Sequence, residues 1–413
     1  MTPTDAAFGR IARLNPVLRA FTALDTANAR AAAAISAGRI AAGRARPLEG
    51  VPIGIKANIA VKGLATTAGV EARRHAIADT DAAVVTRLRD AGAVILGHLN
   101  MHEAALGATT DNQAYGRTEN PHGIGRTPGG SSGGSGAAVA AGLCVVALGT
   151  DTLGSVRIPA AYNGVYGTKP TNGLVPADGL VMLEARFDCI GPLAASMSDL
   201  AAAMAVLAPL GVARPVARVA TLAAVDAAPM EPAVRAGYDA AIAAMRRLGV
   251  AVALAPTPAL DLGGARTAGF IASARSAATI FAADRATGGI SPGFARLLDI
   301  GEAATPATLA AGEAVMAAAA ATLHRLLERH DLLLTPTTPQ AAFAHGRAPV
   351  TQADFTALAN IAGLPALSLP SGVDDSGLPV AVQIIGRAGD DATLLAFAAL
   401  LDTELAAFRP PPP

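Results

Sequence analysis

The apolar positions of this chain alternate between two spacings, one typical of helices and one typical of buried strands. In residues 81–91 they fall at Ala82, Val85 and Leu88, which is the spacing of one helix face. Residues 93–97 follow as a short apolar run that predicts a buried strand. Because helix and strand patterns alternate in this way, the chain is predicted to form an α/β fold.

The same patterns predict elements along the rest of the chain. Strands are also predicted at 50–59, 143–148, 216–222, 250–254, 331–339, 364–370 and 378–385. Helices are predicted within 1–21, 14–45, 136–142, 231–248, 307–330 and 391–408. The sequence Asp-Asp-Ser-Gly at 374–377 indicates a hairpin turn between the last two strands. Residues 409–413 are expected to form a frayed tail.

The composition is typical of a large folded core. Of the 413 residues, 52% are hydrophobic and 15% are charged, which excludes disorder for most of the chain. No polar linker or run of like charges divides the sequence. We therefore expect a single domain over residues 1–413.

Charge and cysteine content exclude several kinds of partner and location. The 32 Lys and Arg residues balance the 32 Asp and Glu residues, so the basic excess of a nucleic-acid-binding protein is missing. The nearly uncharged stretch 131–150 is broken by glycines and predicts no membrane span, and the charges within 1–21 do not fit a signal peptide. The widely separated Cys144 and Cys189 indicate buried thiols in a reducing cytosol, so we expect a cytoplasmic protein.

Two loops rich in glycine and serine carry the candidate chemistry. They are Pro-Gly-Gly-Ser-Ser-Gly-Gly-Ser-Gly at 128–136 and Gly-Thr-Asp-Thr-Leu-Gly-Ser at 149–155. A phosphate-binding P-loop would need a lysine after its last glycine, but Ala137 stands there. Serine hydroxyls beside many backbone N–H groups, together with a buried neutral amine such as Lys56, can carry out acyl transfer without a histidine. The loops therefore favour an amide hydrolase.

The histidines indicate neither a metal site nor a Ser-His-Asp triad. His102 and Glu103 begin like a zinc-protease motif, but Leu106 occupies the place of the second histidine. We therefore predict no metal and no cofactor, and the catalytic base must be another residue.

Several separated motifs resemble the amidase signature family. They are the segments 50–56 (Gly-Val-Pro-Ile-Gly-Ile-Lys), 100–103 (Asn-Met-His-Glu), 129–142, 149–161, 164–171, 363–366 and 377–386. This resemblance covers nearly the whole chain and implies a large mixed central β-sheet with helices on both faces. It places the signature core at about 50–195, and residues 331–408 are expected to complete the same sheet and pocket.

The resemblance also implies a catalytic triad of two serines and a lysine. Ser155 is expected to be the acylating nucleophile, Ser131 the bridging serine after a cis peptide bond, and Lys56 the general base. Burial among aliphatic residues would lower the pKa of Lys56 and keep its amine neutral. Family members often have acidic residues near this lysine, whereas Ala57 and Ala60 occupy those places here.

The second loop is expected to form the oxyanion hole through backbone N–H groups. The candidate residues are Thr152, Leu153, Gly154 and Ser155, with Gly130 beside them. Family members often have glycine where Leu153 stands, so we expect Leu153 to keep a negative φ and to narrow the acyl pocket.

Other polar residues of the two loops are expected to have structural roles. Ser132 and Ser135 are expected to shape the first loop, and Asp151 and Arg157 to form a local structural pair rather than a substrate clamp.

The sequence therefore predicts an amidase that cleaves a small or apolar linear carboxylic amide, a C–N bond other than a peptide bond. Alternatives are a glutamine-dependent amidotransferase A-type subunit, an allophanate, urea-derivative or carbamate hydrolase, and a noncatalytic binding protein on this scaffold. The expected partner is a small-molecule amide, with no nucleic acid and no membrane. Since family members are often dimers, the resemblance also allows a homodimer.

Overall fold

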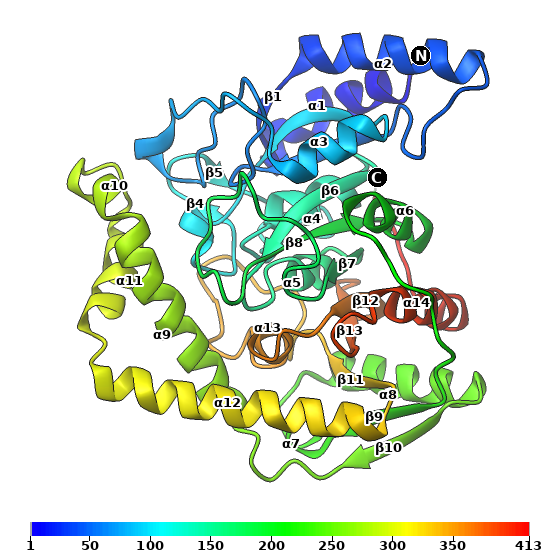
Figure 1. The fold of residues 1–413 in the computed structure, drawn as a ribbon, viewed down its shortest axis with the longest axis vertical. Coiled ribbons are helices and arrows are strands. Elements are labelled where there is room, and N and C mark those ends of the chain that lie inside the picture. Colours follow the sequence, from blue (N-terminus) through cyan, green and yellow to red (C-terminus); the bar gives the residue numbers. More distant parts are fainter. Residues whose placement is uncertain (1, 413) are drawn as a thin grey trace.

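A single 11-stranded sheet forms the centre of the molecule (Figure 1). The computed structural model describes residues 2–412. In spatial order the strands are β1 (Phe21–Leu24), β3 (Val94–Leu99), β2 (Pro52–Lys56), β6 (Val146–Asp151), β8 (Cys189–Ala194), β7 (Tyr166–Lys169), β12 (Ala366–Val373), β13 (Pro379–Ile385), β11 (Leu332–Pro336), β9 (Arg218–Leu222) and β10 (Ala251–Ala255). A separate two-stranded sheet pairs β4 (Asp111–Asn112) with β5 (Gly116–Arg117).

The sheet is mixed, as predicted. Strands β3, β2 and β6 are parallel to one another, as are β11, β9 and β10, whereas β8, β7, β12 and β13 pair in antiparallel fashion between these two groups. Strands β11, β12 and β13 from the C-terminal part therefore belong to the same sheet as β2 and β6.

The helices cover both faces of the sheet. They are α1 (Pro3–Leu18), α2 (Thr26–Ala41), α3 (Ala83–Asp90), α4 (Gly133–Ala140), α5 (Arg157–Tyr162), α6 (Met197–Leu207), α7 (Ala223–Asp226), α8 (Pro232–Arg247), α9 (Leu262–Ile280), α10 (Ala282–Ala286), α11 (Pro292–Ala303), α12 (Pro306–Arg329), α13 (Ala357–Ile361) and α14 (Asp391–Leu405). Figure 1 shows α1 and α2 near β1 at the top, α12 across the lower part near β9, and α9 and α11 along the left side.

Alternation along the strands divides the core between these two faces. In β11, Leu332 and Leu334 pack into the cluster that contains α6, α8 and α14, whereas Leu333 between them packs into the cluster that contains α12 and α13. Neighbouring side chains of a strand point to opposite faces, so a continuous apolar run is the pattern of a strand buried on both sides. The α/β fold class and the central mixed sheet predicted from the sequence are confirmed.

Most predicted elements are present, but some boundaries differ. The strand expected at 143–148 lies at Val146–Asp151, because α4 is followed by a turn before the chain enters the sheet. As a result the second glycine-serine loop begins only after Asp151. The helix and buried strand on either side of this turn account for the uncharged stretch 131–150, and Cys144 and Cys189 are buried free thiols.

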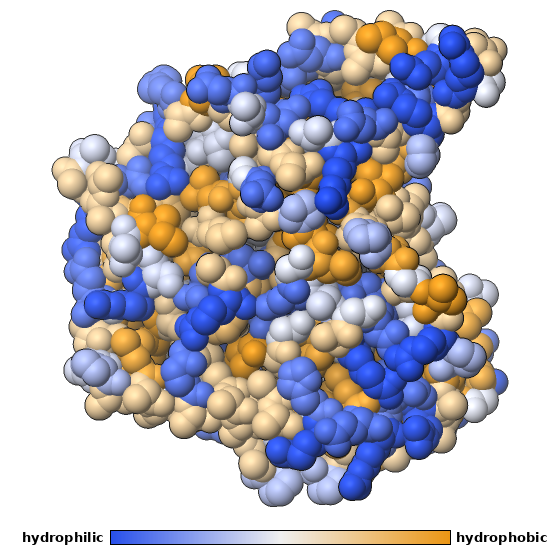
Figure 2. Space-filling view, viewed as in Figure 1, coloured by the Kyte–Doolittle hydropathy of each residue, from blue (hydrophilic) through white to orange (hydrophobic). Residues whose placement is uncertain are grey.

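Helix α12 is long and apolar enough to cross a membrane by length and composition, and it alone among the described helices passes that test. Its apolar character comes largely from alanine, and Met316, Ala319, Leu323 and Leu327 are buried against the rest of the protein. On the face drawn in Figure 2, hydrophilic and hydrophobic residues are interspersed. These features fit a helix that covers the core.

The end of the chain is irregular beyond α14. Phe408 still stacks on Tyr166 with ring centroids 6.2 Å apart, and residues 409–412 have no regular secondary structure. The predicted tail therefore begins after an anchored aromatic residue, and Pro413 lies outside the described residues.

Candidate active site

Two neighbouring parallel strands bring the candidate catalytic residues together. Strand β2 ends at Lys56, and β6, its parallel neighbour, ends at Asp151 and leads into the loop that holds Ser155. The carboxyl ends of parallel strands lie at the same edge of a sheet, so the lysine and the loop meet there. Ser131 lies in the other loop, just before α4 begins at Gly133.

Lys56 is fully buried and contacts two hydroxyl groups. Its Nζ lies 2.7 Å from Ser131 Oγ and 2.7 Å from Thr150 Oγ1. Asn58 Nδ2 donates to the same Thr150 oxygen at 3.2 Å, which orients that hydroxyl beside the amine. The amine therefore has a defined position relative to Ser131.

Burial lowers the pKa of Lys56 to about 7, because an ammonium group loses most of its hydration there. The carboxylates of Asp188 and Asp151 act in the opposite direction and favour the charged form. The short alanine side chains at 57 and 60 therefore do not leave the lysine free of acidic neighbours, because these two approach from other segments. Burial remains the larger effect, so a substantial fraction of the amine is neutral near pH 7.

The first loop is held rigidly around Ser131. The peptide bond between Gly130 and Ser131 is cis. A Cβ atom on Gly130 would lie 2.6 Å from the backbone nitrogen of Thr109, so no side chain fits at this position. The Ser131 carbonyl accepts a hydrogen bond from the His102 N–H at 3.0 Å, which ties the loop to the segment after β3.

The two loops also bind each other directly. The backbone N–H of Ser132 donates to the Ser155 carbonyl at 3.2 Å. Ser132 Oγ donates to the Thr150 carbonyl and Ser135 Oγ donates to the Leu148 carbonyl, both at 3.1 Å. Ser132 and Ser135 thus bind the first loop to β6, which is the loop-shaping position expected for them.

The Asp151 carboxylate organises the second loop. It accepts the Gly154 N–H at 2.8 Å and the Val156 N–H at 3.1 Å. Gly154 has φ +126°, and a Cβ there would meet Thr356 Oγ1 at 2.2 Å, so only glycine fits.

One expected oxyanion donor must be corrected. The N–H of Gly154 is already bound to Asp151, whereas those of Thr152, Leu153 and Ser155 donate no hydrogen bond to any residue in 2–412. Leu153 is not among the described residues with positive φ. The Gly130 N–H likewise donates no hydrogen bond to a described residue, so the candidate donors left free in the two loops are those of Gly130, Thr152, Leu153 and Ser155.

Asp151 and Arg157 form a fully buried ion pair. Arg157 Nε and Nη2 donate to the Asp151 carboxylate at 3.0 and 2.9 Å, and its other N–H groups donate to Gln383 at 2.7 Å and Asn360 at 2.6 Å. Burial alone would raise the pKa of Asp151, but the guanidinium group lowers it to about 2. Arg157 is fully buried, and all three of its side-chain nitrogens donate to other buried residues, which fits the structural role expected for it.

A cavity of about 340 Å³ opens beside the Ser155 hydroxyl. Ser155 lines this space, and its Oγ forms no hydrogen bond with Ser131, whose own Oγ is bound to Lys56, or with any other described residue. The lining is mostly apolar and includes Leu106, Leu153, Ile158, Leu183, Phe270 and Val350. Arg266 also lines the cavity and donates from Nε to Asp354 at 2.5 Å.

Sequence reasoning missed three polar residues near Lys56. Thr150 contacts the amine directly and Asp188 acts on its charge, while His102 holds Ser131 through its backbone. Asp188 lies just before β8, and its carboxylate accepts a hydrogen bond from Thr152 Oγ1 at 2.6 Å. It is far from Lys56 in the sequence, so only the folded sheet brings it close to the lysine. Thr150 could have been found, since it precedes Asp151 on the strand parallel to β2.

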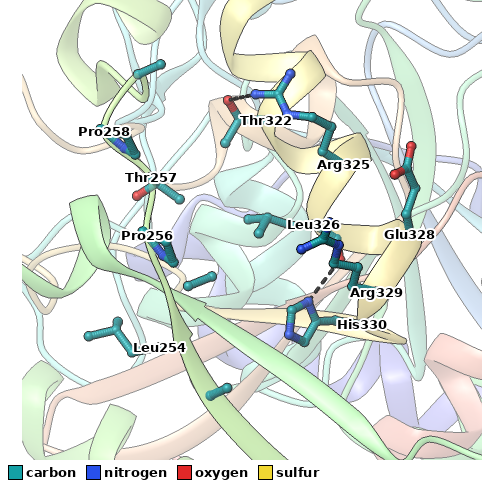
Figure 3. A pocket seen from close by; sticks show the side chains of 13 residues that line it. Leu254, Pro256, Thr257, Pro258, Thr322, Arg325, Leu326, Glu328, Arg329 and His330 are labelled. Carbon is teal, nitrogen blue, oxygen red and sulfur yellow. Dashed lines mark hydrogen bonds between the residues drawn. The ribbon is translucent and has the colours of Figure 1, made fainter.

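Another cavity lies apart from this site. It measures about 460 Å³ and lies between the edge strand β10 and the C-terminal end of α12 (Figure 3). Arg325, Arg329 and His330 line it, and it shares no residue with the cavity at Ser155. Among residues 2–412, no group of three or more His, Cys, Asp or Glu side chains is placed to hold a metal ion.

The fold, together with the two glycine- and serine-rich loops next to Lys56, defines an enzyme of the amidase signature class. The family model described as Amidase matches residues 3–395, and the chain therefore belongs to the amidase family. The predicted family is confirmed.

Known relatives carry different names within this class. The chain is 38% identical over 446 residues to the A subunit of the glutamyl-tRNA(Gln) amidotransferase of Roseiflexus castenholzii, covering 95% of this chain and 90% of the relative. Among solved structures, it resembles a chain of "an unexpected vestigial protein complex" that "reveals the evolutionary origins of an s-triazine catabolic enzyme", with TM-score 0.90, 30% identity and coverage of 99% and 97%. It also resembles the peptide amidase of Stenotrophomonas maltophilia, with TM-score 0.83, 30% identity and coverage of 99% and 94%.

Replacing Arg157 by methionine tests the structural role of the buried ion pair. The change leaves the Asp151 charge buried without its partner, so we expect a loss of roughly 3–5 kcal/mol in unfolding free energy. The matched control is Arg247→Met, which removes a solvent-exposed ion pair with Glu404 and should cost about 0–1 kcal/mol. Urea denaturation of both variants measures the difference, and equal losses would contradict the assignment.

Proposed function

We propose that this protein is an amidohydrolase in which Ser155 attacks an amide carbonyl and Lys56 acts as the base through Ser131. The observation that carries the proposal is the fully buried Lys56 amine 2.7 Å from the Ser131 hydroxyl. A base is most effective when its pKa lies close to the working pH, and the pKa of Lys56 is lowered by burial to about 7. No histidine is needed for this relay.

Acylation begins with two proton transfers. Neutral Lys56 takes the proton of the Ser131 hydroxyl while Ser131 takes that of Ser155, and Ser155 Oγ bonds to the carbonyl carbon. The resulting tetrahedral intermediate breaks its C–N bond, and the proton on Lys56 returns through Ser131 to the leaving nitrogen. An amine or ammonia departs, and the acyl group remains on Ser155.

Deacylation uses the same relay with water as the nucleophile. Water attacks the acyl carbonyl while its proton passes through Ser131 to Lys56, and the proton then returns to Ser155 as the C–O bond breaks. The free N–H groups of the two loops, those of Gly130, Thr152, Leu153 and Ser155, would stabilise the negative oxygen in both steps. Because backbone N–H groups serve as the donors, no charged side chain is needed to stabilise the oxyanion.

The cavity indicates the substrate class. Its mostly apolar lining fits a compact hydrophobic acyl group, and the nucleophile lies at its wall. We propose a linear carboxylic amide with such an acyl group as the substrate.

Active-site labelling tests the nucleophile. A fluorophosphonate should modify Ser155 in the wild type, and mass spectrometry of peptides should locate the adduct there. The Ser155→Ala variant should lose labelling and roughly 10⁴-fold or more in kcat for amide hydrolysis. The exposed Ser198→Ala variant serves as the control and should keep both. Labelling at another serine, or activity retained in Ser155→Ala, would rule out the mechanism.

The pH dependence of kcat/KM tests the base. Only neutral Lys56 can accept a proton, and its lowered pKa makes this form appear as the pH rises through about 7. We therefore expect kcat/KM to rise about tenfold per pH unit below 7 and to level off above it. A profile that is flat between pH 5 and 9 would contradict the role of Lys56.

A glutamine-dependent amidotransferase subunit is the second candidate function, and the name of the Roseiflexus relative favours it. Arg266 lines the cavity and pairs with Asp354, and their side chains are 23% and 15% exposed. Such a pair matches the carboxylate and ammonium groups of an α-amino acid whose side-chain amide lies at Ser155. In this role a partner protein would use the released ammonia.

Replacing Arg266 by methionine separates the two candidate functions. If glutamine is the substrate, the variant should lose about 10- to 100-fold in kcat/KM for glutamine, because a charge-assisted hydrogen bond is removed. Hydrolysis of an uncharged amide such as butyramide should change little. Ammonia release from each substrate measures this, and a wild type that hydrolyses butyramide but not glutamine would dismiss the amidotransferase role for the isolated chain.

A further inference from the structure

Leu153 is the side chain of the nucleophile loop that faces both the cavity and a neighbouring helix. It lines the cavity at Ser155, and its two methyl carbons lie 2.9 and 3.4 Å from the place where a Cβ of Gly269 would be. Gly269 is a buried residue in the middle of α9. Glycine is less favourable than alanine within a helix by roughly 1 kcal/mol. The close packing of Leu153 explains why a glycine stands at position 269, because a larger residue would collide with the leucine.

The tip of Leu153 fills a hydrophobic recess beyond the cavity. Phe187, Ala268, Ala272 and Met316 form a buried apolar cluster, against which Leu153 and Ile361 pack. Three of these residues lie on α9 and α12, and the small alanines leave the space that the leucine occupies. The recess therefore adjoins the acyl cavity, with Leu153 between them.

The backbone of Leu153 is held independently of its side chain. Thr356 Oγ1 donates to the Leu153 carbonyl at 2.7 Å, and the next N–H, that of Gly154, donates to Asp151. Shortening the side chain leaves both hydrogen bonds in place. The oxyanion donors can thus be kept while the wall of the cavity is changed.

We infer that Leu153, seated in the notch at Gly269, closes the acyl cavity and limits the length of aliphatic acyl chain that the enzyme accepts. This inference rests on the proposed amide hydrolysis at Ser155. The preferred substrates are amides of short aliphatic acids, and the recess behind Leu153 is a latent extension of the acyl site. An added methylene that finds space in a hydrophobic pocket changes kcat/KM by about 10- to 200-fold, so the limit is measurable.

The first test is the Leu153→Ala variant with a series of linear amides from acetamide to decanamide. We expect the ratio of kcat/KM for octanamide to that for butyramide to rise at least about tenfold. Because the ratio compares two amides in the same variant, a change in rate that is common to all amides does not affect it. An unchanged ratio would overturn the inference.

The Gly269→Ala variant tests the same contact from the other side. Its new methyl group would lie 2.9 Å from the Leu153 side chain and push it toward the cavity. We expect the octanamide to butyramide ratio to fall below that of the wild type. In the double variant Leu153→Ala, Gly269→Ala the collision is gone, so the ratio should return close to that of Leu153→Ala. Additive effects of the two changes would contradict the contact.

Failure of this inference can be distinguished from failure of the proposed function. If the wild type hydrolyses none of the amides and Ser155 is not labelled, the proposed function fails. If it hydrolyses them with loss in Ser155→Ala, but the chain-length profile is the same in all Leu153 and Gly269 variants, only the role of Leu153 fails. Thermal unfolding of each variant confirms that it is folded, and Leu153→Ala alone decides the outcome if Gly269→Ala does not fold.

Discussion

The burial of one amine at the end of β2 is the constraint on which the site depends. An ammonium group in an apolar interior is costly, and the protein lowers that cost by making the neutral form of Lys56 accessible near pH 7. The neutral form is also the one that can accept a proton. Desolvation, which works against the charged lysine, therefore produces the base that the proposed chemistry requires.

The neighbouring carboxylates set the limits of this effect. Arg157 keeps Asp151 ionised, and the Asp151 carboxylate accepts hydrogen bonds from the backbone N–H groups of Gly154 and Val156. Its negative charge is therefore largely balanced by these donors. Burial raises the pKa of Asp188, which weakens its own tendency to be charged beside Lys56. The ion pair thus organises the loop that holds Ser155, while burial still favours the neutral form of Lys56. The same arrangement leaves the N–H groups of Thr152, Leu153 and Ser155 in this loop without an acceptor among the described residues.

Much of the fold could be predicted because its strands are short apolar runs between helical segments. Strands β2, β9, β11 and β13 follow this pattern closely. Strand β8 was missed, since its sequence Cys-Ile-Gly-Pro-Leu-Ala contains glycine and proline, which are typical of turns. Helix α9 was missed because its many alanine and glycine residues give little periodic contrast.

The candidate site was predictable to a different extent. The positions of Lys56, Ser131 and Ser155 followed from separated motifs, and their roles remain predictions. The engagement of the Gly154 N–H by Asp151 depends on loop geometry, which no sequence pattern specifies. Asp188 and the notch at Gly269 come from segments far along the chain, so their approach to Lys56 and Leu153 depends on the order of strands in the sheet and on helix packing.

The protonation of Lys56 itself is the most direct test of this account. Lysines labelled with ¹³C at Cε can be followed by NMR between pH 5 and 11, with the Lys56 signal assigned by its loss in Lys56→Met. We predict that this signal titrates with a midpoint near the pKa of about 7 caused by burial. A midpoint near 10.4, about the value of an exposed lysine, would contradict the claim that burial makes Lys56 the catalytic base.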